Sequence, residues 1–201
     1  MSILKSALQA AFDRFGYKVI RTSMLSDITE DMDAEFFPLY KTCKPYSMTS
    51  LPRMYALYKA MEYISRYSLP GDIVECGVWK GGSCMLCASE LLRRGEMNRQ
   101  IYLYDTFKGM AAPTDKDVAF EGKAMQDKWQ DLQKSAHNDW CYSSLEDVKR
   151  AVFSVGYPKE RFTFVEGKVE DTIPGAIPEQ IAILRLDTDW YESTKHELTH
   201  I

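Results

Sequence analysis

The residues best suited to chemistry lie close together, within residues 72–83 (DIVECGVWKGGS). The first half of this stretch is apolar and β-branched, as in a buried parallel strand, and it carries Glu75 near its end. A helical pattern begins after Ser83, and three glycines precede it: Gly77, Gly81 and Gly82. Glycines let the backbone approach a ligand closely, and the first turn of a helix offers free N–H groups. The stretch predicts a cofactor site of the nucleotide type, the alternative being an ordinary tight turn in an α/β domain.

The glycine spacing and the acid Glu75 together indicate which kind of cofactor the site would bind. The spacing Gly77-x-x-x-Gly81-Gly82 differs from the G-x-G-x-x-G pattern of dinucleotide sites. A carboxylate at Glu75 would repel a pyrophosphate, but it can bind the cationic amino group of S-adenosylmethionine, which carries a sulfonium and no phosphate. The pattern therefore favours S-adenosylmethionine, and an oxidoreductase that uses NAD is the disfavoured alternative.

Two further strand ends predict contacts with the same cofactor. Residues 100–105 are typical of a second strand and end in Asp105, at the position where doubly wound folds bind the ribose hydroxyls. We predict that Asp105 and the adjacent Thr106 contact the cofactor, the alternative for Asp105 being a helix or turn cap. The loop after the third strand would meet the adenine through Val169 or Glu170.

A fourth strand end supplies acids on the acceptor side. Residues 181–187 are apolar and end in Asp187, with Asp189 two residues further on. A carboxylate there can take a proton from a hydroxyl, or can hold a divalent cation that lowers the pKa of that hydroxyl. Oxygen ligands suit Mg²⁺ rather than zinc. Capping of the last helix is the alternative for both aspartates. Three aromatic residues could stack on an acceptor: Trp129, Trp140 and Tyr191.

The elements that must position these residues alternate between strand and helix, which predicts an α/β fold with a parallel sheet. Strand patterns occupy the first half of residues 72–83 and then residues 100–105, 161–166 and 181–187. Helical patterns occupy residues 3–16, 51–67 and 143–156, and further helices follow Ser83 and Asp189. Ser143 and Glu146 match the spacing of a capping box. Residues 106–142 are irregular, as expected of a substrate lid inserted at the carboxyl end of a strand.

The composition limits which binding partners and which cellular compartment can be expected. The 201 residues carry a formal net charge of -4, with a pI near 5.5, so nucleic acid is not an expected partner. The sequence has no apolar run long enough for a membrane span, and charges interrupt the first 20 residues where a signal peptide needs an apolar core. The five cysteines lack a disulfide framework. We therefore expect a cytoplasmic protein with reduced thiols, in which Cys84 and Cys87 serve helix packing.

Four motifs, in this order along the chain, resemble those of the macrocin O-methyltransferase family. They are PYSMTS (45–50), GDIVECGVWKGGS (71–83), YDTFKGM (104–110) and LRLDTDWYEST (184–194). Enzymes of this family methylate sugar hydroxyls in natural-product biosynthesis, using S-adenosylmethionine and usually Mg²⁺.

The resemblance implies a fold, a site and a function. The fold would be a doubly wound, Rossmann-like class I methyltransferase sheet, with residues 1–50 as a helical N-terminal extension and lid and residues 51–201 as the S-adenosylmethionine-binding domain. The cofactor site would include Glu75, Gly77, Ser83 and Asp105. Asp187 would be both a metal ligand and the general base. The implied function is O-methyl transfer to a small-molecule hydroxyl acceptor, the sugar of a glycosylated natural product.

One departure from the family concerns the C-terminal part. The family continues for several more strands, the next of which ends in an Asp-Asp pair that completes the metal site, and this sequence ends before them. We therefore expect a sheet that lacks its C-terminal strands and a metal site with one of its three ligands. The alternative function is a truncated, non-catalytic module or fragment that binds S-adenosylmethionine. The apolar N-terminal part could also pack on a second copy, which would give a homo-oligomer.

Overall fold

The computed structural model of the chain describes residues 12, 14, 31–119 and 121–201. The chain divides into two compact units, Met1–Glu35 and Phe36–Ile201. The predicted helix over residues 3–16 lies almost wholly outside the described residues. The fold given below is that of the second unit.

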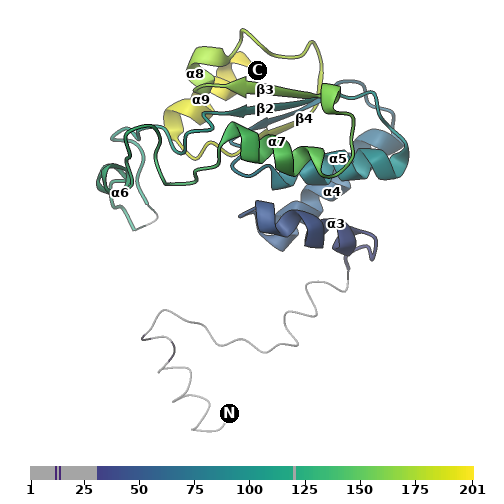
Figure 1. Ribbon diagram of the computed structural model, residues 1–201, viewed down its shortest axis with the longest axis horizontal. Coiled ribbons are helices and arrows are strands. Elements are labelled where there is room, and N and C mark those ends of the chain that lie inside the picture. The colour runs from purple at the N-terminus through teal and green to yellow at the C-terminus, as the bar shows by residue number, and fades with distance from the viewer. Residues whose placement is uncertain (1–11, 13, 15–30, 120) are drawn as a thin grey trace. The chain divides into compact units, whose positions relative to one another are not determined.

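A four-stranded parallel sheet forms the centre of this unit (Figure 1). Its strands are β1 (Asp72–Cys76), β2 (Ile101–Asp105), β3 (Phe162–Glu166) and β4 (Ile181–Leu186). They lie in the order β3-β2-β1-β4, and each of the three pairings is parallel. All four carboxyl ends therefore meet at one edge of the sheet. The predicted α/β class, the positions of the four strands and their parallel arrangement are confirmed.

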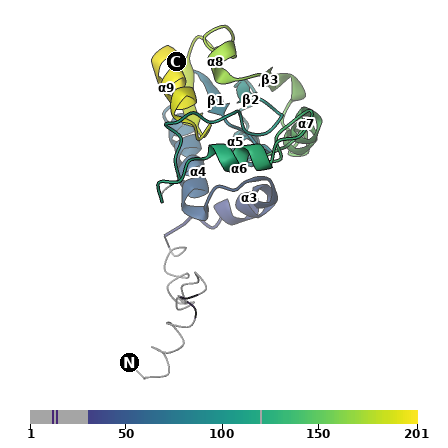
Figure 2. The ribbon, with the colours of Figure 1, turned by 90° about the vertical axis from the view of Figure 1, so that its left-hand side faces the viewer.

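Helices cover both faces of the sheet (Figures 1 and 2). On one face lie α4 (Leu51–Arg66), α5 (Gly82–Arg94) and α7 (Leu145–Phe153), and on the other lie α8 (Val169–Thr172) and α9 (Tyr191–His200). Coverage of both faces explains why β1 is buried along four of its five residues.

The core follows the same division into two faces. On the α8 face, Val74 and Cys76 of β1 and Tyr104 of β2 pack with Val169 and Ile173. On the opposite side, α5 is buried along most of its length, and its fully or almost fully buried apolar residues include Met85, Leu86 and Leu91. The helix that follows the glycine turn is therefore a central element of the core.

Residues 36–46 pack onto α4. They form α3 (Phe36–Cys43) and a short 3-10 helix, η1 (Lys44–Tyr46). Phe36 is fully buried, with its ring centroid 5.1 Å from that of Tyr55 and 5.4 Å from that of Tyr58. The role predicted for residues 1–50, an extension and lid, stays a prediction.

The start of α7 differs from the predicted capping box by one residue. The cap is Ser144, whose Oγ accepts a hydrogen bond from the Asp147 N–H at 3.2 Å. Ser143, the predicted cap, is buried instead, and Glu146 forms an ion pair with Lys149 at 2.9 Å. Because Ser143 and Ser144 are adjacent, the sequence did not determine which of them caps the helix. In the structure Ser143 is buried and Ser144 is the cap.

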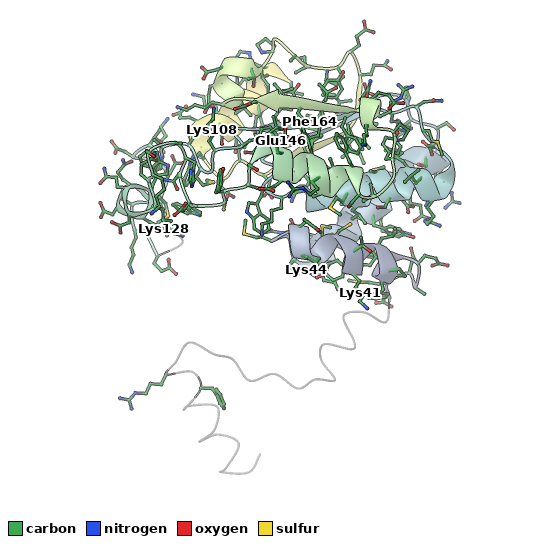
Figure 3. All side chains as sticks on the ribbon, in the orientation of Figure 1. Lys41, Lys44, Lys108, Lys128, Glu146 and Phe164 are labelled. Atoms are coloured by element: carbon green, nitrogen blue, oxygen red, sulfur yellow. The ribbon has the colours of Figure 1, made fainter. Side chains whose placement is uncertain are left out.

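The insertion after β2 has little regular structure, as predicted, but it is held by specific contacts. It contains the short helix α6 (Gln126–Asp131), and η2 (Lys159–Arg161) comes later, just before β3. Asp117 is buried and accepts hydrogen bonds from the N–H groups of Thr114 at 2.7 Å and Tyr191 at 2.8 Å, which joins the insertion to the start of α9. Lys128, labelled in Figure 3, places its ammonium 3.8 Å from the centroid of the Trp140 ring. No helix in the described part of the chain is long and apolar enough to cross a membrane.

Candidate cofactor and acceptor site

One cavity at the carboxyl edge of the sheet brings together all eight residues that the sequence predicts for the site. They are Glu75, Gly77, Ser83, Asp105, Thr106, Val169, Glu170 and Asp187. Successive strands extend from β1 to β3 on one side, whereas β4 returns to the other side of β1. Open parallel sheets bind ligands at this kind of switch point, outside the carboxyl ends of the strands. The structure thus confirms that these residues are neighbours, and their individual roles stay predictions.

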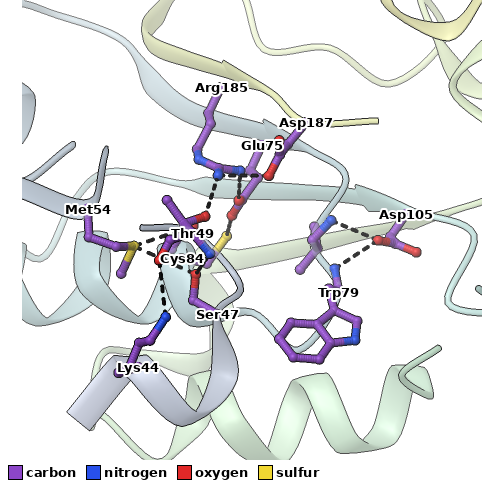
Figure 4. Close-up of polar contacts among 12 residues, drawn as sticks. Lys44, Ser47, Thr49, Met54, Glu75, Trp79, Cys84, Asp105, Arg185 and Asp187 are labelled. Carbon is purple, nitrogen blue, oxygen red and sulfur yellow. Dashed lines mark hydrogen bonds and ion pairs between the residues drawn. The ribbon is translucent and has the colours of Figure 1, made fainter. Parts of the chain in front are cut away.

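Asp105 organises the turn after β1 (Figure 4). Its Oδ2 accepts hydrogen bonds from the N–H groups of Val78 at 2.7 Å and Trp79 at 3.0 Å. Its Oδ1 accepts one from the N–H of Phe107 at 2.8 Å. A carboxylate offers about four acceptor positions, so these three bonds leave capacity for a ligand hydroxyl. Thr106, the neighbour of Asp105, donates its hydroxyl to the carbonyl of Gly109 at 2.6 Å.

Glu75 is buried, 3% exposed, and bonded on both of its oxygens. Arg185 Nη1 donates to Oε1 at 2.6 Å, and the thiol of Cys84 donates to Oε2 at 2.7 Å (Figure 4). Burial raises the pKa of Glu75, and the charge of Arg185 opposes that rise. The acid that the sequence assigns to the cofactor therefore has a cationic partner within the protein, and a ligand ammonium would share Glu75 with Arg185.

Two of the glycines serve close approaches between backbone segments. Gly77 has a φ of +84°, and a Cβ there would overlap the carbonyl of Asp187 in the loop after β4. Gly82, the first residue of α5, would place a Cβ 2.6 Å from the carbonyl oxygen of Tyr46. The glycine turn is thus enclosed by protein on two sides. The sequence predicts the close approach of a ligand at these glycines, whereas at Gly77 and Gly82 it is other backbone segments that come close.

The loop after β3 lies beside the end of β2. The N–H of Gly167 donates to the carbonyl of Asp105 at 3.0 Å. Val169 is buried, 4% exposed, within the core of the α8 face, although it also lines the cavity. Glu170 accepts a hydrogen bond from the hydroxyl of Ser193 at 2.8 Å. Contact of either residue with an adenine stays a prediction.

The part of the cavity that the sequence assigns to the acceptor, residues 187–190, carries two exposed aspartates. Asp187 Oδ2 accepts a hydrogen bond from Arg185 Nη2 at 2.8 Å. Asp189 has a φ of +67°, an uncommon conformation for a residue with a side chain. Partial burial and then the charge of Asp187 raise the pKa of Asp189. A general base acts best when its pKa lies closer to neutral pH, so Asp189 joins Asp187 as a candidate.

Residues 9–201 match the sequence family described as Macrocin-O-methyltransferase (TylF). The chain belongs to this family. It is 31% identical over 156 residues to the 8-demethyl-8-(2,3-dimethoxy-alpha-L-rhamnosyl)-tetracenomycin-C 4'-O-methyltransferase of Streptomyces olivaceus, a match that covers 78% of this chain and 57% of that protein. It is also 31% identical over 156 residues to the demethyldecarbamoylnovobiocin O-methyltransferase of Streptomyces niveus, covering 78% of this chain and 56% of that protein.

The solved structures that are similar to this chain include NovP and CalS11. The O-methyltransferase NovP superposes with a TM-score of 0.64 at 29% identity, over 78% of this chain and 61% of that one. CalS11, a calicheamicin methyltransferase, shares the fold with a TM-score of 0.59 at 20% identity, over 100% of this chain and 74% of that one. This member of the macrocin O-methyltransferase family thus spans well under two thirds of the length of the curated relatives it matches.

The magnesium site implied by the macrocin O-methyltransferase family is not assembled by the residues that the structure describes. Among them, no group of three or more His, Cys, Asp or Glu side chains is arranged to hold a metal ion. Asp187 is bound instead by the guanidinium of Arg185, and a fixed positive charge at that place disfavours a second cation. The described residues do not fit Mg²⁺ by themselves, and Asp187 as a metal ligand stays a prediction.

Several residues at the cavity were missed in the sequence. Trp79 and Trp190 line it, whereas none of the three aromatic residues proposed as stacking partners does so: Trp129, Trp140 and Tyr191. The Nε1 of Trp129 donates to the carbonyl of Met110 at 2.8 Å, and the ring of Trp140 packs edge-on against Trp190. Arg185 was also not assigned to the site from the sequence. A single charged residue in an otherwise apolar strand indicates that the charge has a partner inside the protein.

Proposed function

We propose that this chain binds S-adenosylmethionine and transfers its methyl group to a hydroxyl of a sugar in a glycosylated natural product. The observation that carries the proposal is the convergence of eight predicted residues on one cavity at the switch point of the sheet. Family membership supports it, since the relatives' names include O-methyltransferases of a rhamnosyl tetracenomycin and of a novobiocin precursor.

The chemistry of the cofactor side suits this ligand. Asp105 has acceptor capacity for the ribose hydroxyls and, through Val78 and Trp79, fixes the turn that would lie under the methionine part. Glu75 provides negative charge for the amino group, and its bond to Arg185 keeps it oriented. When bound, S-adenosylmethionine supplies a methyl carbon activated by a sulfonium.

On the acceptor side, the protein's task is to orient a hydroxyl and to accept its proton. The acceptor oxygen forms a bond to the methyl carbon while the carbon–sulfur bond breaks, and the proton passes to a carboxylate. Asp187 is the proposed general base, with Asp189 as the second candidate at the same mouth. The ring of Trp79 offers a flat apolar surface on which a sugar can stack. Trp190 also lines the cavity, but it is only 7% exposed and its ring packs against Trp140.

A second candidate function is a module that binds the cofactor without turnover. It is favoured by one observation, the lack of a three-ligand metal group among the described residues. The two candidates differ in a single measurable respect, the formation of S-adenosylhomocysteine from a bound cofactor.

The test begins with calorimetric titration of S-adenosylmethionine into the purified chain, with and without Mg²⁺. Saturable binding is expected, and a folded chain that binds no cofactor would refute both candidates. The assay for S-adenosylhomocysteine release then uses 8-demethyl-8-(2,3-dimethoxy-α-L-rhamnosyl)-tetracenomycin C as the acceptor probe. Release that depends on the acceptor supports the transferase, whereas binding without release across this and related glycosides favours the non-catalytic module.

A further inference from the structure

Arg185 connects three separate parts of the chain at the floor of the cavity (Figure 4). It is the register partner of Glu75 in the parallel pairing of β1 with β4, so the two side chains project to the same face. Its guanidinium donates to Glu75 Oε1 at 2.6 Å, to Asp187 Oδ2 at 2.8 Å and to Thr49 Oγ1 at 2.9 Å. The Arg185 side chain is only 19% exposed. One group thus contacts the cofactor side, the acceptor side and the residues that precede α4.

The third contact concerns a segment that has no helix or strand of its own. Residues 47–49 line the cavity opposite the sheet. The N–H of Thr49 donates to the hydroxyl of Ser47 at 3.1 Å, and Ser47 packs against Gly82 at the start of α5. Among the described residues, the bond from Arg185 to Thr49 ties this segment to strand β4 of the sheet.

We infer that Arg185 is a positioning residue, which fixes the segment of residues 47–49 and the acids Glu75 and Asp187 in one arrangement. The inference rests on the proposed function, because this arrangement sets the line between a methyl donor and an acceptor hydroxyl. The three bonds of the Arg185 guanidinium all go to protein groups, so its proposed role is to position them. It acts through Glu75 on the cofactor side and through Asp187 on the acceptor side.

The chemistry of arginine suits this role better than that of lysine. The guanidinium is a rigid planar fork with five donors, so it can hold three acceptors from different segments in fixed directions. A lysine would keep the positive charge between the two acids, but its single ammonium is compact and cannot reproduce the fork. Methyl transfer is sensitive to such changes, because a displacement of roughly 1 Å can cost about 100-fold in rate.

The first measurement needs no ligand. Hydrogen exchange of the backbone amides of residues 46–50 is compared in the cofactor-free parent chain and in Arg185→Lys and Thr49→Val. In both variants, exchange in this segment should rise at least about tenfold, because the bond to the sheet is lost while the core remains. Thr49→Ser, which keeps the acceptor hydroxyl, should recover most of the protection lost in Thr49→Val.

The matched control is Arg94→Lys. Arg94 is 22% exposed and pairs with the buried Glu90 at 2.6 Å, much as Arg185 pairs with Glu75, but neither Arg94 nor Glu90 lines the cavity. This variant should leave exchange in residues 46–50 within about twofold of the parent. Equal exchange in the parent and Arg185→Lys, or an equal rise in Arg94→Lys, would overturn the inference.

The second measurement is the dissociation constant of S-adenosylmethionine across a double-mutant cycle. Thr49→Val should weaken binding by about tenfold and Arg185→Lys by at least that much. The double variant should bind no more weakly than Arg185→Lys alone, because that change already removes the bond to Thr49. A general loss of stability would instead give multiplied effects of about 100-fold, and that result would overturn the positioning role. If the parent chain binds no cofactor, the proposed function fails, and the exchange measurement still decides whether Arg185 holds the segment.

Discussion

The two sides of the cavity are built by different means. On the cofactor side, Glu75 is buried and Asp105 is held by three backbone N–H groups, so the geometry is set by the backbone of adjacent parallel strands. On the acceptor side, Asp187 and Asp189 are exposed and follow a strand at the edge of the described sheet. The backbone of Asp187 is held by the sheet, since its N–H donates to the carbonyl of Cys76 at 2.8 Å. Its carboxylate, in contrast, is held by the side chain of Arg185.

This difference has a physical consequence. Backbone hydrogen bonds inside a sheet are protected by the core, and they change only when the fold itself opens. Contacts between exposed side chains are weaker, because water competes for the same groups. We therefore expect the cofactor side to respond to mutations mainly through stability and affinity, and the acceptor side mainly through turnover.

The largest effect should come from Gly77→Ala, since Gly77 is where the two sides meet. Its Cβ would overlap the carbonyl of Asp187, and an alanine at a φ of +84° is strained as well. Overpacking and backbone strain together should lower the free energy of unfolding by about 3 kcal/mol. Urea denaturation measures this loss.

The matched control for Gly77→Ala is Gly156→Ala. Gly156 has the same φ of +84°, but nothing lies within 4 Å of its Cβ position. Strain alone should then cost about 1 kcal/mol. Equal losses in both variants would mean that the close approach between the two sides contributes nothing.

Asp187→Asn should separate turnover from binding. The amide removes the proposed base and leaves the shape of the side chain, so turnover should fall at least about 100-fold. The dissociation constant of S-adenosylmethionine, measured by calorimetry, should change by less than about threefold, because the cofactor side is untouched. Asp115→Asn, a change at an exposed acid outside the cavity, is the control.

Retained turnover in Asp187→Asn would remove Asp187 from the mechanism. Asp189→Asn is the companion variant for that case. If Asp189→Asn alone abolishes turnover, the base is Asp189, and the charge of Asp187 serves to raise the pKa of Asp189.

Asp105→Asn should give the opposite pattern. The amide presents donors to the N–H groups of Val78 and Trp79 in place of one acceptor oxygen, and it weakens the contact with a ribose. Affinity for S-adenosylmethionine should fall by about 30-fold, close to 2 kcal/mol. Turnover at saturating cofactor should stay within about threefold of the parent. Asp171→Asn, at an exposed acid of α8 outside the cavity, should bind normally.

An effect of pH should arise from a buried acid beneath the acceptor side. Glu197 of α9 is fully buried, and burial raises its pKa to about 7. Its Oε2 accepts a hydrogen bond from Thr188 at 3.3 Å, whereas its Oε1 has no hydrogen-bond partner among the described residues. The folded state therefore holds the proton in a pH range where the unfolded chain, with a pKa near 4.5, has lost it.

The sign follows from this difference in bound protons. Stability due to Glu197 is fully present below the unfolded pKa and is lost as pH rises from about 4.5 to about 7. We expect a loss of roughly 3 kcal/mol over that range, since each unit of pKa difference corresponds to about 1.4 kcal/mol. Glu197→Gln should be equally stable at low pH and more stable than the parent at pH 8 by a similar amount. Parallel curves of stability against pH for the two proteins, measured by urea unfolding, would contradict this expectation.

The order of strands and helices, and the residues at the strand ends, could be predicted from the sequence. Apolar β-branched runs such as residues 72–76 mark strands that are buried on both faces, and parallel strands bring their carboxyl ends to one edge. Hence the positions of Glu75, Asp105 and Asp187 along the chain were enough to place them in a common cavity. Four motifs in the right order were enough to predict the family, which the match over residues 9–201 confirms.

Other features depended on contacts between residues distant in sequence. The pairing of Arg185 with Glu75 spans 110 positions, and its bond to Thr49 spans 136, so no local pattern could indicate them. Trp190 lines the cavity, whereas Trp129 and Trp140 do not, and this depends on how the insertion packs against the start of α9. The sequence by itself determined which backbone elements form and which acids end them, because these depend on local periodicity and strand direction. Only the tertiary structure decided how those acids are neutralised and enclosed, because that depends on which distant side chains share the same buried space.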